Sequence, residues 1–350
     1  MQCRAKRNNG DEPMVMRRQA TFMKCSTYLS AVLGVAMLAG GCSEGVDEPD
    51  GDGQSTPVEL RFRMVDAQGQ DFRCGETGLE LAGLNDVTPN DARLYLHDFH
   101  LITTAGELVP VALDPSSEWQ HEGVVLLDFE DATEGCEFVI FGRPQTAQTN
   151  ALVRGVAESQ GPFEGVTFRL GVPIELNHIE AQSAPAPLNV TGMEHGQSAG
   201  RQFIRVAFYQ EAQVNSPSYH LLSFRSVCDE AVIEGQAPDD ARDCLKPNRA
   251  DYRLSSQGFD PGEAEILIDL GELFSGYDVS QAGDDAQGFN AEGRVDCFSP
   301  LHAGDLPGGE EQAASIGAER CGRFYNPLGL DYESGRPQQG VTQSVFRIAE

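Results

Sequence analysis

The residues best suited to chemistry in this chain are histidines, with a methionine close to two of them. His178 follows residues 171–177, in which Pro173 fixes the backbone, so the imidazole is presented from a rigid loop. Met193 and His195 come shortly afterwards in the sequence. Neutral imidazole is the commonest metal-binding side chain, and a thioether helps to hold Cu(I). These residues therefore point to metal binding, with copper as a chemically suitable ion.

Two further histidines, His97 and His100, lie in residues 91–101, where polar and apolar side chains alternate. Such alternation predicts a β-strand, in which successive side chains point to opposite faces. Two residues three apart then point in opposite directions unless a bulge intervenes, so His97 and His100 are not expected to bind one ion. On a regular strand Asp98 would also point away from His97.

A Gly-x-Ser-x-Gly sequence at residues 196–200 would suit a different chemistry, that of an esterase nucleophile, here Ser198. In that arrangement the serine lies on a turn between a strand and a helix. Residues 203–209 instead alternate like a strand, and the chain has no His-Gly-Gly-Gly oxyanion motif. Five-residue matches also arise by chance in a chain with 38 glycines. The esterase is therefore a disfavoured alternative.

Carboxylates beside the predicted strands are a further source of chemistry. Asp128 and Glu130 could form an acid/base pair. Such carboxylates are more often surface groups, or groups that orient a metal ligand through its other nitrogen. We expect one of these two roles for them.

Short segments of period-two alternation dominate the chain and predict the fold class. Gly, Pro, Asn and Asp punctuate these segments, as in a β-sandwich. We expect a mainly β protein, an antiparallel β-sandwich with little helix. Residues 263–274 fit either one short helix or a strand and a turn, and residues 341–348 alternate like an edge strand. The predicted strands are residues 58–65, 93–102, 124–129, 166–170 and 203–209.

The chain is strongly acidic, with a formal net charge of −29 over 350 residues. Such a surface repels phosphate backbones, so nucleic acid is not expected as a partner. The charge favours solubility and attracts cations, but it identifies no substrate.

The N-terminus has the features of an export signal. Residues 1–41 combine basic residues with an apolar segment too short for a membrane-spanning helix, and they predict a signal peptide. The end of this segment, Ala-Gly-Gly followed by Cys42, is similar to a bacterial lipobox, so lipidation of Cys42 is expected. Residues 42–57 are acidic and rich in Gly and Pro, which predicts a flexible tether.

Six cysteines remain after the signal and Cys42, and in an oxidising compartment we expect them to form disulfides. Six cysteines permit 15 pairings, and none of the six has Cys-x-x-Cys spacing. The absence of that spacing excludes zinc ribbons and thioredoxin-like chemistry. The six are Cys74, Cys136, Cys228, Cys244, Cys297 and Cys321.

Together, residues 91–101, 124–130, 171–178, 187–189 and 247–250, with Met193, Cys228 and Cys244, resemble the MbnP-like copper-binding proteins, also called metallo-mystery-pair four-Cys proteins. The resemblance covers about residues 58–275. It implies an exported β-sandwich that binds one copper ion through histidines. In that family a partner di-haem protein, MbnH-like and related to peroxidases, oxidises a tryptophan to a kynurenine ligand. Here Trp119 is the only tryptophan, and it lies in a different motif. No kynurenine ligand is therefore expected.

The resemblance also implies roles for individual residues. The family often has a histidine at the place of His97, so His97 and His178 are the favoured ligands. His195 could replace the tryptophan-derived ligand, with Met193 nearby. Sequence proximity and the family's four-Cys pattern favour Cys74–Cys136, Cys228–Cys244 and Cys297–Cys321 as disulfides. Residues 276–350 lie beyond the resemblance and are expected to form a loop-rich, disulfide-pinned extension.

The leading interpretation is a non-enzymatic copper-binding lipoprotein of a Gram-negative cell envelope, in the periplasm or at the outer membrane. Its expected partners are the copper ion, the membrane through the lipid anchor, and a di-haem peroxidase-like protein. One alternative is a metal-free surface-binding β-sandwich, and the other is the esterase.

Overall fold

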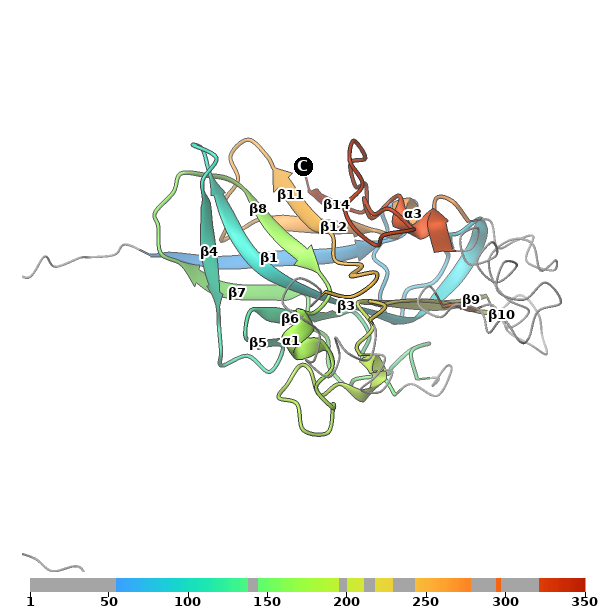
Figure 1. Cartoon of the computed structure of the whole chain (residues 1–350). Coiled ribbons are helices and arrows are strands. Elements are labelled where there is room, and N and C mark those ends of the chain that lie inside the picture. The colour runs from blue at the N-terminus through green and yellow to red at the C-terminus, as the bar shows by residue number, and fades with distance from the viewer. Residues whose placement is uncertain are drawn as a thin grey trace, which may run out of the picture. The chain divides into compact units, whose positions relative to one another are not determined.

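Strands far outnumber helices in the computed structural model, so the predicted mainly β fold is confirmed (Figure 1). The structure describes residues 55–137, 144–194, 200–210, 218–228, 243–277, 294–296 and 321–349. The predicted signal peptide, Cys42 and nearly all of the predicted tether lie outside these residues. No helix within the described ranges is both long and apolar enough to cross a membrane.

Each strand that was predicted in the first half of the chain is present in the structure. The strands of this half are β1 (Thr56–Val65), β2 (Leu79–Leu81), β3 (Leu84–Thr103), β4 (Leu108–Leu113), β5 (Gln120–His121), β6 (Val124–Asp128), β7 (Leu152–Ala157) and β8 (Phe163–Leu170). The second half contributes β9 (Ile204–Gln210), β10 (Ser218–Phe224), β11 (Asp251–Ser255), β12 (Glu265–Asp269), β13 (Arg294–Asp296) and β14 (Phe346–Ile348). The short helices are α1 (Ile174–Asn177), the 3-10 helix η2 (Thr191–Met193) and α3 (Leu270–Leu273).

The strands form two groups that are joined by the β3–β4 hairpin. One group pairs β4, β7, β1, β12 and β14 in that order. The other is built around the long β3, which pairs with β2, β6, β8 and β9, and β9 in turn pairs with β10. Two pairs, β1–β12 and β10–β13, are parallel. The prediction of a purely antiparallel sheet is therefore wrong at these two pairs, because strands distant in sequence meet there.

Aromatic side chains fill the space between the two groups of strands. The Phe62 ring on β1 lies 5.8 Å from the Phe168 ring on β8, measured between centroids. Phe346 on β14 lies 5.3 Å from Phe168 and 4.5 Å from Tyr252 on β11. The core therefore lies between the groups, and the last strand of the chain helps to close it, as the alternation of residues 341–348 predicted.

A β-bulge interrupts β3 at Asp98, which has a positive φ of 59°. His97 is opposite Arg169 of β8 and His100 is opposite Thr167, so Asp98 and Phe99 together oppose a single residue. This extra residue places His97 and His100 on the same face of the sheet. The expectation that they point to opposite faces is therefore wrong, because the regular strand on which it relied does not exist here.

Two of the predicted disulfides are present, Cys74–Cys136 and Cys228–Cys244. The third pairing stays a prediction, because Cys297 lies outside the described residues. Its proposed partner Cys321 is buried. Residues 263–274, for which two structures were open, form β12 followed by the single turn of α3. The Asp269 carboxylate caps that turn by accepting the Glu272 amide hydrogen at 3.0 Å.

Candidate metal centre

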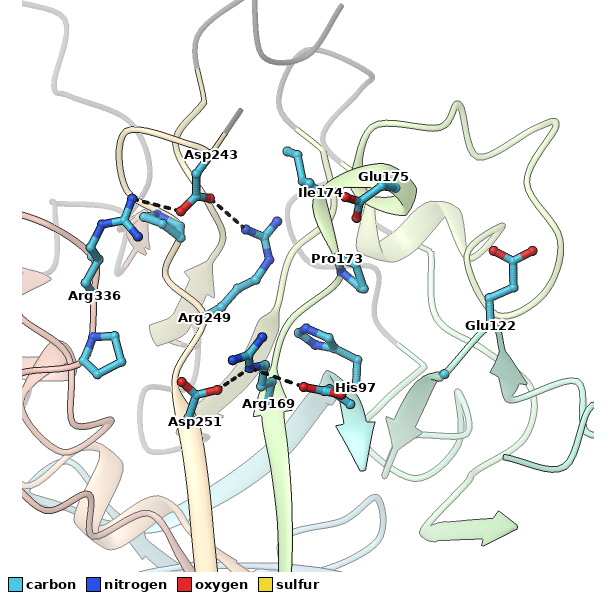
Figure 2. Close-up of a pocket in the computed structure, with 15 residues that line it drawn as sticks. His97, Glu122, Arg169, Pro173, Ile174, Glu175, Asp243, Arg249, Asp251 and Arg336 are labelled. Atoms are coloured by element: carbon cyan, nitrogen blue, oxygen red, sulfur yellow. Dashed lines mark hydrogen bonds and ion pairs between the residues drawn. The ribbon is translucent and has the colours of Figure 1, made fainter. Parts of the chain in front are cut away.

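A pocket of about 580 Å³ lies where β3, β8 and the segment that leads into β11 meet α1. His97 is the histidine that lines this pocket. Pro173, which follows β8, and Glu175 of α1 line the same pocket (Figure 2). Charged side chains of both signs complete the lining. The arrangement brings an imidazole, guanidinium groups and carboxylates into one cavity.

His97 is held in a state suited to metal binding. Its Nδ1–H donates to the Gly171 carbonyl at 2.9 Å, which leaves Nε2 as the nitrogen with a lone pair. The residue is 6% exposed. Burial lowers the pKa of His97 to about 4, and the charge of Arg249 adds to this effect. The imidazole is therefore neutral at pH 7, as a metal ligand must be.

Gly171 can accept this hydrogen bond because the residue is glycine. Its φ is +95°, and a Cβ at this position would lie 2.6 Å from the ring of Phe203. Its own amide donates to the Tyr95 carbonyl at 2.7 Å, which fixes the end of β8 against β3. The backbone that orients His97 is thus rigid.

The cations of the pocket are anchored by carboxylates around it. Arg169 pairs with Asp251 and, at 3.5 Å, with Asp98. Arg336 lies 2.9 Å from Asp243, measured between Nη2 and Oδ2 (Figure 2). These pairs are about half exposed, so each contributes little to stability. They place carboxylate groups on the wall of the same cavity as the imidazole.

Arg249 is the most buried cation of the pocket. Its Nε donates to the Val172 carbonyl at 2.7 Å, and its guanidinium lies 5.4 Å from the centroid of the Phe203 ring. Nη1 is 3.7 Å from the Asp243 carboxylate. Burial lowers the pKa of Arg249 to about 10, so the group remains charged at neutral pH. Sequence reasoning missed this residue, although it lies inside residues 247–250, one of the motifs on which the resemblance rests.

His178 lies at the C-terminal end of α1 and is not among the residues that line this pocket. The amide oxygen of Asn177 accepts the Arg201 backbone hydrogen at 3.1 Å, so its NH₂ group faces and donates to His178 Nε2 at 3.1 Å. His178 is 8% exposed and lies next to Cys228 and Cys244. The two favoured ligands, His97 and His178, therefore lie in different surroundings, His97 in the pocket and His178 beside the Cys228–Cys244 disulfide.

The other predicted site residues are placed as follows. Met193 is fully buried in the hydrophobic core and does not line the pocket. His195 and Ser198 lie outside the described residues. The segment after residues 196–200 forms the strand β9, not the helix of an esterase elbow. Trp119 packs against the core and lines a separate pocket of about 340 Å³.

The other side chains that sequence reasoning misjudged are carboxylates. Asp98, which was expected to point away from His97, lines the pocket because of the bulge. Asp128 and Glu130, for which a surface or ligand-orienting role was expected, are 0% exposed. They belong to a buried cluster with Arg93, whose Nη1 lies 3.3 Å from a Glu130 oxygen. That cluster does not line the pocket.

One donor of this pocket, the His97 imidazole, suits copper. A neutral imidazole nitrogen suits Cu(I) and Cu(II), and carboxylate oxygens from Asp98 and Glu175 are available around the same cavity. Among the described residues, His178, Cys228 and Cys244 are the one group of three potential ligand side chains whose ligand atoms lie within 4.8 Å of one another. Its two sulfurs are joined in a disulfide.

The fold and the pocket together define a mainly β protein with a histidine-containing polar site. The MbnP family model matches residues 55–291, and the chain belongs to this family. The solved structure of MbnP from Methylosinus trichosporium is similar, with 25% sequence identity and a TM-score of 0.61. The match covers 84% of this chain and 98% of that one. No curated protein matches the chain. Membership of the family supports a copper-related role in general terms.

Proposed function

We propose that this protein binds copper through histidines at the cell envelope and has no catalytic activity of its own. The observation that carries the proposal is the state of His97. Its Nδ1–H is used by the Gly171 carbonyl, its Nε2 lone pair is left for a ligand, and burial keeps the ring neutral. A histidine without a ligand role needs no such arrangement beside a cavity of about 580 Å³.

His97 is the ligand that geometry supports most directly. His178 and His195 are the further histidines of the proposal, because they lie in the part of the chain that carries the family resemblance. Met193 is the weakest candidate, because its side chain is fully buried in the core. No kynurenine takes part in this proposal, since the chain lacks a tryptophan near residues 193–200. A di-haem peroxidase-like partner is then needed only if it acts on another residue.

The envelope location is part of the same proposal. It is supported by the apolar N-terminal segment, by Cys42 after small residues, and by two disulfides, which persist in oxidising compartments. Mass spectrometry of the mature protein tests it directly. A diacylglyceryl group on Cys42 is the expected result, and a mature N-terminus without lipid would reject the anchor.

The copper site is tested by titrating the purified protein with Cu(II) and comparing His97→Gln with His220→Gln. His220 is a matched control, because burial also lowers its pKa to about 4 but it lies on β10 and does not line the pocket. We expect His97→Gln to weaken binding by at least about tenfold and His220→Gln to leave it unchanged. Equal affinities in all three proteins would reject His97 as a ligand. No binding in any of them would favour the metal-free surface-binding module.

A further inference from the structure

A second group of metal-ligating side chains lies outside the pocket of His97. One ring nitrogen of His178 and the sulfurs of Cys228 and Cys244 all lie within 4.8 Å of one another. The three residues come from different segments, at the end of α1, after β10 and before β11. The sulfurs are joined in a disulfide, so neither is a thiolate and the oxidised cluster lacks the soft ligands that copper prefers.

The backbone around this cluster holds the two cysteines together independently of their bond. Val227 and Lys246 form an antiparallel bridge, with N–H···O distances of 2.8 and 3.0 Å. Each of these residues is close in sequence to one cysteine. The Asn248 side chain adds a hydrogen bond of 2.6 Å to the Arg225 carbonyl. After reduction, the two sulfurs would therefore stay close to each other and to His178.

The two sulfurs differ in their access to solvent. Cys228 is half-buried, whereas Cys244 is 2% exposed. A thiolate from solution can therefore reach Cys228 Sγ more easily, with Cys244 as the leaving group. His178 is held beside them, since the Asn177 NH₂ group donates both to its Nε2 and to Ser226 Oγ, which lies 3.5 Å from Cys228 Sγ.

We propose that His178, Cys228 and Cys244 form a redox-gated site for Cu(I), which assembles when a dithiol reduces the Cys228–Cys244 disulfide. One thiolate of the dithiol attacks Cys228 Sγ, and the Cys228–Cys244 bond breaks. Its second thiol then resolves the mixed disulfide, so the dithiol is oxidised to its own disulfide. The two cysteines receive two electrons and, from the dithiol, two protons. Cu(I) then displaces those protons to solvent and replaces the Asn177 NH₂ group at the lone pair of His178 Nε2. It thereby binds two thiolates and one imidazole, a donor set that suits this soft ion.

This site goes beyond the proposed function, because it gives His178, one of the further histidines of that proposal, a different set of co-ligands, and it does not depend on His97. The Cys74–Cys136 disulfide provides the matched control within the same chain. Cys74 is also half-buried, but among the described residues no histidine or carboxylate completes a group of three around that disulfide. Reduction of both disulfides should therefore create one copper site, at Cys228 and Cys244.

The test is anaerobic Cu(I) titration of the mature protein against bicinchoninate. It is run on the protein as purified and after treatment with dithiothreitol and desalting, with circular dichroism to follow the fold. We expect reduction of the wild type to add one Cu(I) per chain. The gain should be absent from Cys228→Ser/Cys244→Ser, should persist in Cys74→Ser/Cys136→Ser and His97→Gln, and should be at least about tenfold weaker in His178→Gln.

Two results would overturn the proposal. One is a reduced wild type that keeps its fold and gains no Cu(I). The other is a gain that His178→Gln leaves unchanged, because an unfolded chain with free thiols would bind Cu(I) without needing the imidazole. Loss of the first copper in oxidised His97→Gln, with the reductive gain intact, would show that the two sites are separate.

Discussion

Buried charges in the second group of strands balance one another residue by residue. Arg93 is 0% exposed and makes two hydrogen bonds to the Asp91 carboxylate, at 2.8 and 2.6 Å. Arg205 contacts the same carboxylate. Burial alone would raise the pKa of Asp91, but the two arginines outweigh it and hold the pKa below its ordinary value. Asp128 differs, because burial raises its pKa well above the ordinary value. The two arginines thus favour the charged form of Asp91, whereas burial favours the neutral form of Asp128.

This difference predicts opposite outcomes for two conservative substitutions. Asp91→Asn leaves two buried arginines without their shared counter-ion and should lower the free energy of unfolding by about 3–5 kcal/mol. Asp128→Asn replaces a group whose neutral form is favoured and can keep hydrogen bonds to Thr146 and to the Glu130 amide, so it should lower the free energy of unfolding by less than about 1 kcal/mol. Urea denaturation at pH 7 measures both. Equal costs would contradict the assigned charge states.

His220 predicts a dependence of stability on pH. It stacks on Phe208, with ring centroids 5.2 Å apart, and burial lowers its pKa to about 4. Since the unfolded pKa is about 6.5, the unfolded chain binds the proton first as the pH falls. The contribution of His220 is complete above about pH 6.5 and is lost between there and pH 4. The stability difference between wild type and His220→Gln should shrink across this window by about 3 kcal/mol or less. A stability difference that stays constant across this pH window would contradict the lowered pKa of His220.

At the scale of elements, the bulge in β3 is the feature on which the site depends. A positive φ costs most residues roughly 1–2 kcal/mol, whereas Asn and Asp tolerate it best after Gly. Asp98→Val should therefore destabilise the protein by at least about 1–2 kcal/mol and weaken copper binding through His97. Asp98→Asn removes the same charge but suits the same backbone, and it should preserve stability. If both variants lost copper equally, the Asp98 charge and not the bulge would be the cause.

The strands could be predicted from sequence because alternation is a local property of each segment. The bulge could not be assigned in this way. The alternation of residues 91–101 shifts phase at the consecutive polar residues His97 and Asp98, but only the pairing with β8 shows that an extra residue causes the shift. The burial of Asp128 and Glu130 was equally hidden, because it depends on Arg93, which reaches Glu130 from the neighbouring strand β3. His97 was identified through the resemblance, while its hydrogen bond to Gly171 needed the structure.

At the scale of the whole molecule, the chain closes its core with its last strand. Phe346 is 2% exposed and packs between Phe168 and Tyr252, from strands of the other group. Sequence alone indicated an edge strand but not its partner, because that pairing with β12 joins residues far apart in the chain.

Neighbouring substitutions on β14 test this closure. Phe346→Ala should lower the free energy of unfolding by about 3–5 kcal/mol, since it opens a cavity between the two groups of strands. Arg347→Ala is the control, because its side chain is 50% exposed and pairs with Asp269 at the surface, so about 1 kcal/mol or less is expected. Thermal denaturation measures both variants. If Phe346→Ala and Arg347→Ala lowered the free energy of unfolding by similarly small amounts, β14 would not be part of the cooperative core.

The central claim is that the protein holds copper through His97. Elemental analysis of the mature protein purified from its native envelope, with copper counted per chain, tests it most directly when wild type and His97→Ala are compared. We expect near-stoichiometric copper in the wild type and its loss from His97→Ala at unchanged circular dichroism. Copper that is absent from the wild type even after loading, or that is equal in both proteins, would contradict it.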